Sequence, residues 1–133
     1  MKRTQAAWLE VDQYLEAFET AQRQTPGIDI DEFLPSNEHP LYNVILKELI
    51  RIDLEYRNHS GMPRTLDYYH RVFPMFFLDR EAVREVAFEE FRQRRERGEN
   101  PSLAEYEQRF GVDTSRWPKP TSLVRFPTRL PRV

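Results

Sequence analysis

The sequence predicts an all-α protein, a compact bundle of about six helices followed by an extended C-terminal tail. Apolar side chains recur at spacings of three and four along several stretches, a pattern typical of amphipathic helices. Nine Phe, six Tyr and two Trp among 133 residues supply enough apolar bulk for one folded core. Proline, glycine and capping residues separate these stretches, as expected at helix boundaries.

The first two elements are predicted between residues 5 and 35. A helix over residues 5–24 carries one apolar stripe, and Pro26-Gly27 ends it. The stripe consists of Trp8, Val11, Tyr14, Leu15 and Phe18. A short turn follows, with Asp29 as the expected cap.

A long helix over about residues 40–59 is predicted to be the centre of the fold. Pro40 suits its first turn, because a proline there removes no intrahelical hydrogen bond. Its apolar residues are Leu41, Val44, Ile45, Leu46, Leu49, Ile50, Ile52, Leu54 and Tyr56. They cover most of the circumference, and a helix that is apolar nearly all round is a buried one.

Two segments repeat one pattern: a long helix, a glycine, a proline and a short capped helix. The repeats span about residues 41–74 and 79–111. Three positions recur with an offset of 37, namely Leu66, Tyr69 and Phe73 as Leu103, Tyr106 and Phe110. Tyr56-Arg57 and Phe91-Arg92 align with an offset of only 35. Two such units are too few for a solenoid, so we expect them to close against the first helix.

Capping residues predict where the later helices begin. Asp79 is expected to begin the second long helix. Ser102 with Glu105 forms a capping-box pattern for the second short helix, and Thr65 is expected to cap the first.

Charge and proline content divide the chain into a bundle over residues 1–115 and a proline-rich basic tail or linker over residues 116–133. The tail carries five basic residues and no acidic one, whereas residues 1–115 carry 15 basic and 22 acidic residues. A nucleic-acid-binding domain is expected to show a basic face on its folded part, so this distribution argues against one. The tail offers Thr121, Ser122 and Thr128 as possible phosphorylation sites beside basic residues.

Two surface features are candidate partner-binding sites. The connection at residues 74–77 has more apolar bulk than a linker needs, so Phe76 and Phe77 are either core residues or an exposed docking site. The arginines of residues 92–97 form either a solvated helix extension or a ridge for a protein partner. The residues that we single out for partner binding are Phe76, Phe77, Arg94, Arg95 and Arg97.

The sequence predicts no catalytic, cofactor-binding or metal-binding residues, and therefore no enzyme. The absence of cysteine removes thiolate chemistry, and the four glycines are too widely spaced for a phosphate-binding loop. His70, one turn after Asp67, is the minimal arrangement for a base, but we expect it to face solvent. Glu89 and Glu90 are likewise expected to belong to a solvated face.

Most of the chain, about residues 29–118, resembles the region N-terminal to the catalytic domain of serine/threonine protein kinases from planctomycete bacteria. The resemblance is carried by residues 52–56 (IDLEY), by the two Leu-x-x-Tyr-x-x-x-Phe copies and by residues 110–113 (FGVD). The end of the tail resembles the junction before the kinase glycine-rich loop. The catalytic motifs of a kinase are absent from the sequence, so the resemblance implies an accessory region and transfers no catalytic residue.

We therefore expect a non-enzymatic interaction or regulatory module associated with a bacterial serine/threonine kinase, binding a protein partner such as a kinase domain in cis or in trans. The alternative is a free-standing adaptor, or a DNA-associated regulator that uses the basic tail. Acidic residues precede any long apolar stretch at the N-terminus, so neither a signal peptide nor a membrane span is expected. Together with the absence of cysteine, this favours a cytoplasmic protein.

Overall fold

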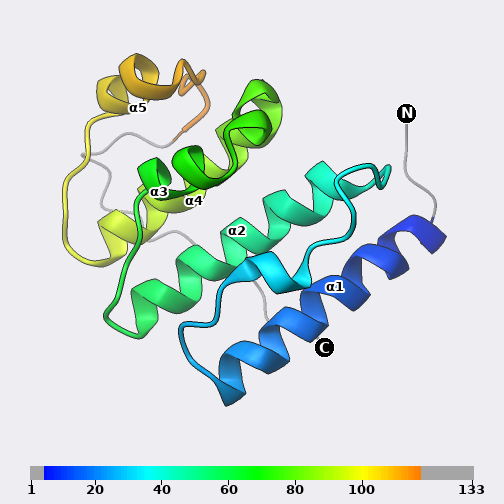
Figure 1. Ribbon diagram of the computed structural model, residues 1–133. Helices are drawn as coiled ribbons and strands as arrows, with labels where there is room; N and C mark the ends of the chain where they lie inside the picture. The colour runs from blue at the N-terminus through cyan, green and yellow to red at the C-terminus, as the bar shows by residue number, and fades with distance from the viewer. Residues whose placement is uncertain (1–4, 118–133) are drawn as a thin grey trace.

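The computed structural model describes residues 5–117, and every regular element in that range is helical (Figure 1). The elements are α1 (Gln5–Gln24), the 3-10 helix η1 (Ile30–Phe33), α2 (Tyr42–His59), α3 (Leu66–Val72), the 3-10 helix η2 (Pro74–Leu78), α4 (Arg80–Glu96) and α5 (Leu103–Phe110). The prediction of an all-α helical bundle is thereby confirmed.

Five α-helices are present between residues 5 and 117 instead of the expected six or so. The difference is the segment after Asp29, which forms the four-residue 3-10 helix η1. Pro35 follows it closely, so the segment is too short to propagate an α-helix. Asp29 does not cap η1 through its side chain, and its carboxylate pairs with Arg57 and Arg64 instead.

Helix α2 lies at the centre of the fold, between α1 on one side and α4 on the other (Figure 1). The short elements α3 and η2 pack on α4, and η1 packs on α1 and α2. This position explains why α2 is apolar nearly all round, since it has neighbours on most of its faces.

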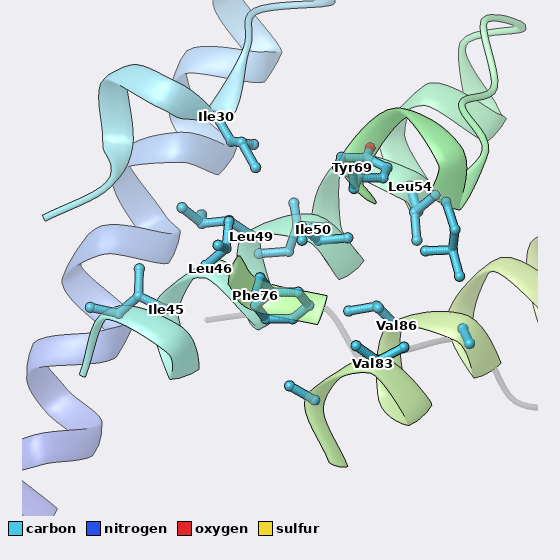
Figure 2. Packing of buried hydrophobic residues seen from close by; sticks show 14 of the residues in the cluster. Ile30, Ile45, Leu46, Leu49, Ile50, Leu54, Tyr69, Phe76, Val83 and Val86 are labelled. Carbon is cyan, nitrogen blue, oxygen red and sulfur yellow. The ribbon is translucent and has the colours of Figure 1, made fainter. Parts of the chain in front are cut away.

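The core is formed mainly by α2, α4 and the stripe of α1. Six apolar residues of α2 are at most 2% exposed: Ile45, Leu46, Leu49, Ile50, Ile52 and Leu54. From α1, Val11, Leu15 and Phe18 are fully buried, whereas Trp8 at the start of the predicted stripe is 44% exposed. Figure 2 shows Ile30 of η1 above Leu49 of α2, so η1 closes this side of the core.

Of the four predicted capping residues, two make a side-chain cap, and two, Asp29 and Thr65, do not. The Asp79 side chain accepts a hydrogen bond from the Ala82 amide, and Ser102 accepts one from the Glu105 amide. Thr65 makes no side-chain cap. The amide of Leu66 at the start of α3 donates instead to the carboxylate of Glu90, at 2.6 Å. A residue of α4 therefore caps α3 and fixes the two helices to each other.

The described chain ends on a packed residue. Trp117 is 7% exposed, and its ring lies 5.3 Å from those of Phe88 and Phe91 and 5.4 Å from that of Tyr106. The packing of the bundle thus includes a residue that we assigned to the tail. The remainder of the predicted tail, with its candidate phosphorylation sites, lies outside the described residues.

Candidate functional site

The apolar residues of η2 lie partly in the core and partly on the surface. Phe76 is only 2% exposed and lies between α2 and α4 (Figure 2). Phe76 is therefore a core residue and does not belong to an exposed docking site. Met75 and Leu78, on the same 3-10 helix, are 74% and 72% exposed. The tight turn after Pro74 thus points Phe76 inward and Met75 and Leu78 outward.

We call the exposed apolar surface here the α3–η2 patch, which consists of Val72, Met75, Phe77 and Leu78. Val72 is 37% exposed, and Phe77 is partly buried against the core. The ring of Phe77 stacks on His70 at 4.6 Å and lies 6.1 Å from the ring of Phe110. Of the patch residues, Phe77 is therefore held by two aromatic neighbours.

The predicted arginine ridge is bonded within the fold. Arg94 donates to Glu105 at 2.7 Å and to the hydroxyl of Tyr106 at 3.1 Å. Arg97 donates to Glu99 at 2.7 Å and to the side-chain oxygen of Asn58 at 2.8 Å.

The guanidinium of Arg95 lies 5.7 Å from the ring centroid of Phe91, in cation–π geometry. Arg94 and Arg97 thus connect the end of α4 to α5 and to α2, whereas the ring contact of Arg95 lies within α4.

The expectation that Glu89 and Glu90 face solvent is wrong. They are 2% and 3% exposed. Glu89 accepts from Gln93 at 2.6 Å, and its carboxylate lies 3.8 Å from the Nε atom of Arg51. The two side chains do point in different directions from α4, but each direction leads to a neighbouring segment: Glu89 lies near Arg51 of α2, and Glu90 bonds Tyr106 of α5.

Asp53 is the centre of a buried polar network. Its carboxylate is fully buried and accepts from the hydroxyl of Tyr69 at 2.5 Å, from Arg57 Nε at 3.0 Å and from Gln22 at 3.2 Å. Arg64 contributes a fourth, longer contact at 3.4 Å. These donors come from α1, α2, α3 and the loop before α3, so one carboxylate connects four segments.

Glu90 is the centre of a second network. Its two carboxylate oxygens accept from the hydroxyl of Tyr106, at 2.7 Å, and from the Leu66 amide. Arg94 donates to the same tyrosine hydroxyl. Sequence reasoning missed both Asp53 and Glu90 as structural residues.

Burial raises the pKa of both carboxyl groups. For Asp53, hydrogen bonding from Tyr69 and the charges of Arg57 and Arg64 act in the opposite direction. For Glu90, the opposing contributions come from Tyr106, the Leu66 amide and Arg94. Desolvation dominates because neither group keeps contact with bulk water.

The raised pKa of Glu90 predicts a pH dependence of stability. A folded-state pKa above the unfolded value of about 4.5 means that the folded protein holds the proton more tightly. The resulting stabilisation is complete below the unfolded pKa and is lost as the pH rises through the folded pKa. Glu90→Gln has no such proton. We therefore expect the free energy of unfolding of the wild type, relative to Glu90→Gln, to fall as the pH rises above about 4.5.

Urea unfolding of both proteins at several pH values measures this difference. The comparison with Glu90→Gln cancels the titration of the remaining carboxyl groups. A difference that stays constant or increases with pH would contradict the assignment of Glu90 as a group stabilised by protonation.

His70 is exposed, as predicted, and Asp67 makes its ion pair with Arg109. Among residues 5–117, no group of three or more His, Asp and Glu side chains is arranged to hold a metal ion. None of the helices in the same range combines the length and apolarity needed to cross a bilayer.

Comparison of the chain with protein-family models, with curated protein sequences and with solved structures finds no match.

Proposed function

We propose that this chain is a non-enzymatic protein-interaction module that docks a partner on the α3–η2 patch and is associated with a bacterial serine/threonine kinase. The docking proposal rests on one observation, namely that η2 buries one of its apolar side chains and exposes two others. Phe76 anchors the turn in the core, while Met75 and Leu78 on the same turn are each more than 70% exposed. Exposed apolar side chains on an anchored turn form a binding surface that needs little ordering.

The chemistry of the patch suits a protein partner. Methionine adapts its shape to irregular apolar surfaces, and Phe77 is held in place by its ring contacts with His70 and Phe110. The excess of acidic over basic residues in residues 1–115 favours a partner with a basic rim, because opposite charges raise the association rate.

The kinase association rests on the sequence resemblance. It implies that the partner is a kinase catalytic domain, either on the same chain or on a separate one. The fold supports a structural rather than catalytic use of its titratable groups, since Asp53 and Glu90 are both occupied by internal hydrogen bonds.

We also infer that the two halves around α2–α3 and α4–α5 are copies of one unit. Tyr69 bonds the carboxylate 16 residues before it, Asp53, and Tyr106 bonds the carboxylate 16 residues before it, Glu90. Arginine follows each carboxylate by four residues, at Arg57 and Arg94. These contacts support a uniform offset of 37, in which Arg57 corresponds to Arg94 and not to Arg92.

The docking proposal is tested by titrating the full chain with purified serine/threonine kinase catalytic domains from the same organism, using calorimetry. We expect one of them to bind. The double variant Met75→Glu/Leu78→Glu should weaken this binding by about tenfold or more, because two charges would be buried in the interface. Gln13→Glu/Gln24→Glu, which adds the same charge at exposed positions of α1, is the control.

Two results would contradict the proposal. Equal binding by the α3–η2 variant and the α1 control would show that the patch is not the docking surface. Failure of every kinase catalytic domain to bind would remove the kinase association.

A further inference from the structure

A pocket lies between α1 and η1, and we call it the α1–η1 pocket. Its volume is about 380 Å³, and its lining includes Glu10, Gln13 and Tyr14 of α1 and Glu32 and Phe33 of η1. This volume is at the small end of the range for ligand-binding pockets, so it suits a long side chain or a short stretch of peptide. The pocket shares no residue with the α3–η2 patch.

The lining of the α1–η1 pocket is acidic. It contains the carboxylates of Glu10 and Glu32 and, among the described residues, no lysine or arginine. The ring of His39 contacts Glu10 through Nε2, at 2.7 Å, and accepts the Leu41 amide on Nδ1, at 3.0 Å. Since Nδ1 accepts, the single ring proton is on Nε2 and His39 is neutral. The hydrogen bond therefore orients Glu10 without cancelling its charge.

Two aromatic rings stand beside these carboxylates. Phe33 packs edge-to-face on Phe18 with ring centroids 5.4 Å apart, and Tyr14 packs on His39 at 6.3 Å. Both rings are partly buried against the core, so their positions are held by packing. A guanidinium group can pair with a carboxylate and stack on an aromatic face at the same time. The lining thus suits an arginine side chain.

The charges of the chain are unevenly distributed. Residues 5–41, which contain α1 and η1, carry eight acidic residues and one basic residue, whereas residues 42–115 carry 14 acidic and 12 basic residues. Residues 118–133 show the reverse, with four basic residues and no acidic one, and with Phe126 and Leu130 among them. The most acidic part of the bundle and the segment that follows the described residues are therefore complementary in charge.

This basic segment is long enough to reach the pocket. It starts after Trp117, whose ring packs on Phe88 and Phe91 of α4. Helix α2 separates α4 from α1 (Figure 1), and the axes of packed helices lie about 8–10 Å apart, so α1 is about 20 Å from α4. The 12 residues from Trp117 to Arg129 span up to about 40 Å when extended. That length suffices to pass around the bundle.

We propose that residues 118–133 bind to the α1–η1 pocket of their own chain, with the guanidinium of Arg129 between the carboxylates of Glu10 and Glu32 and against the rings of Tyr14 and Phe33. The remaining basic side chains of the segment then face the acidic surface around the pocket. This contact is independent of the proposed docking function, because it uses no residue of the α3–η2 patch.

Disulfide trapping in the full chain tests this contact, because the chain contains no cysteine of its own. Gln13→Cys, in the pocket lining, is combined with Thr128→Cys, next to Arg129. The control pair is Gln24→Cys/Thr128→Cys. Gln13 and Gln24 are both exposed, and 11 residues of α1 place them about 16 Å apart along the helix. The rate of disulfide formation in a glutathione buffer, at micromolar protein, is followed by mass spectrometry.

We expect the Gln13→Cys pair to form its intrachain disulfide at least about tenfold faster than the control pair, because a bound segment has a higher effective concentration at the pocket. Adding Arg129→Gln should remove most of this advantage, and so should about 1 M salt, which screens exposed charges. Lys119→Gln is the matched control for Arg129→Gln. It removes the same charge two residues after Trp117, too close to α4 to reach α1, and should leave the advantage in place.

Three results would overturn the proposal. Equal rates for the two cysteine pairs would show that the segment does not bind at the pocket. An equal loss of the advantage with Lys119→Gln and Arg129→Gln would show that net charge, and not a guanidinium in the pocket, brings the segment there. Disulfides formed mainly between two chains would assign the segment to the pocket of a second copy.

Discussion

Asp53→Ala is expected to lower the free energy of unfolding by about 3–5 kcal/mol, the usual cost of removing one partner of a buried ion pair. Arg57 is almost as buried as Asp53, and its Nε donates to both carboxylate oxygens at 3.0 Å. Without Asp53, the Nε–H of Arg57 and the hydroxyl of Tyr69 would remain buried without their acceptor, and Arg57 would keep only its contacts with the Gly27 carbonyl at 2.9 Å and with Asp29 at 3.4 Å. Urea denaturation followed by circular dichroism measures the loss.

Glu16→Ala, which removes an exposed carboxylate from α1, is the control and should change the stability by less than about 0.5 kcal/mol. If Asp53→Ala were no more destabilising than this control, Asp53 would not be the residue that connects the four segments of its network.

Phe76→Ala is expected to lower the free energy of unfolding by about 3–5 kcal/mol, as is typical for truncating a buried aromatic side chain. The ring is 2% exposed and lies between α2 and α4, so its removal would leave a cavity at the centre of the bundle (Figure 2). Thermal and urea unfolding both report this change.

Met75→Ala, at the neighbouring position, tests the division of η2 into an inward and an outward side. Because Met75 is 74% exposed, its truncation should alter stability by no more than about 0.5 kcal/mol. Similar losses for the two variants would show that η2 does not separate core from surface in this way, and the docking proposal would lose its main support.

The positions of the helices were largely predictable, because they depend on periodicity and on capping residues. The stripe of Val11, Leu15 and Phe18 predicted α1, and the all-round apolar character of α2 predicted its central place. The exception was the segment after Asp29, where the capping pattern was present but the chain before Pro35 was too short for an α-helix.

The buried acids were harder to predict, because their burial depends on neighbours distant in the sequence. Glu90 was placed in solvent since its partners, Tyr106 and the Leu66 amide, lie 16 and 24 residues away. A usable signal did exist for Asp53. It stands between Ile52 and Leu54 on a helix that is apolar nearly all round, and an arginine follows it by four residues.

The candidate surfaces were predicted only in part. The apolar side chains at residues 74–77 do include exposed ones. A sequence cannot show which side chains of a tight turn point outward. The sequence therefore suggests Phe76 as a docking residue, whereas Met75 and Leu78 are the exposed ones. Arginine runs are similarly ambiguous. Arg94 donates to a residue of α5 and Arg97 to a residue of α2. Arg51 and Arg84, which lie far apart in the sequence, line the same pocket, and no local sequence pattern predicts this.

The most direct test of the docking account is to map the contact surface by nuclear magnetic resonance on the isotopically labelled full chain, with the kinase catalytic domain that binds it. The account predicts that the amide and methyl signals of Val72, Met75 and Leu78 shift on binding, while those of exposed α1 residues such as Glu16 stay in place. Shifts confined to α1, with the α3–η2 signals unchanged, would contradict it.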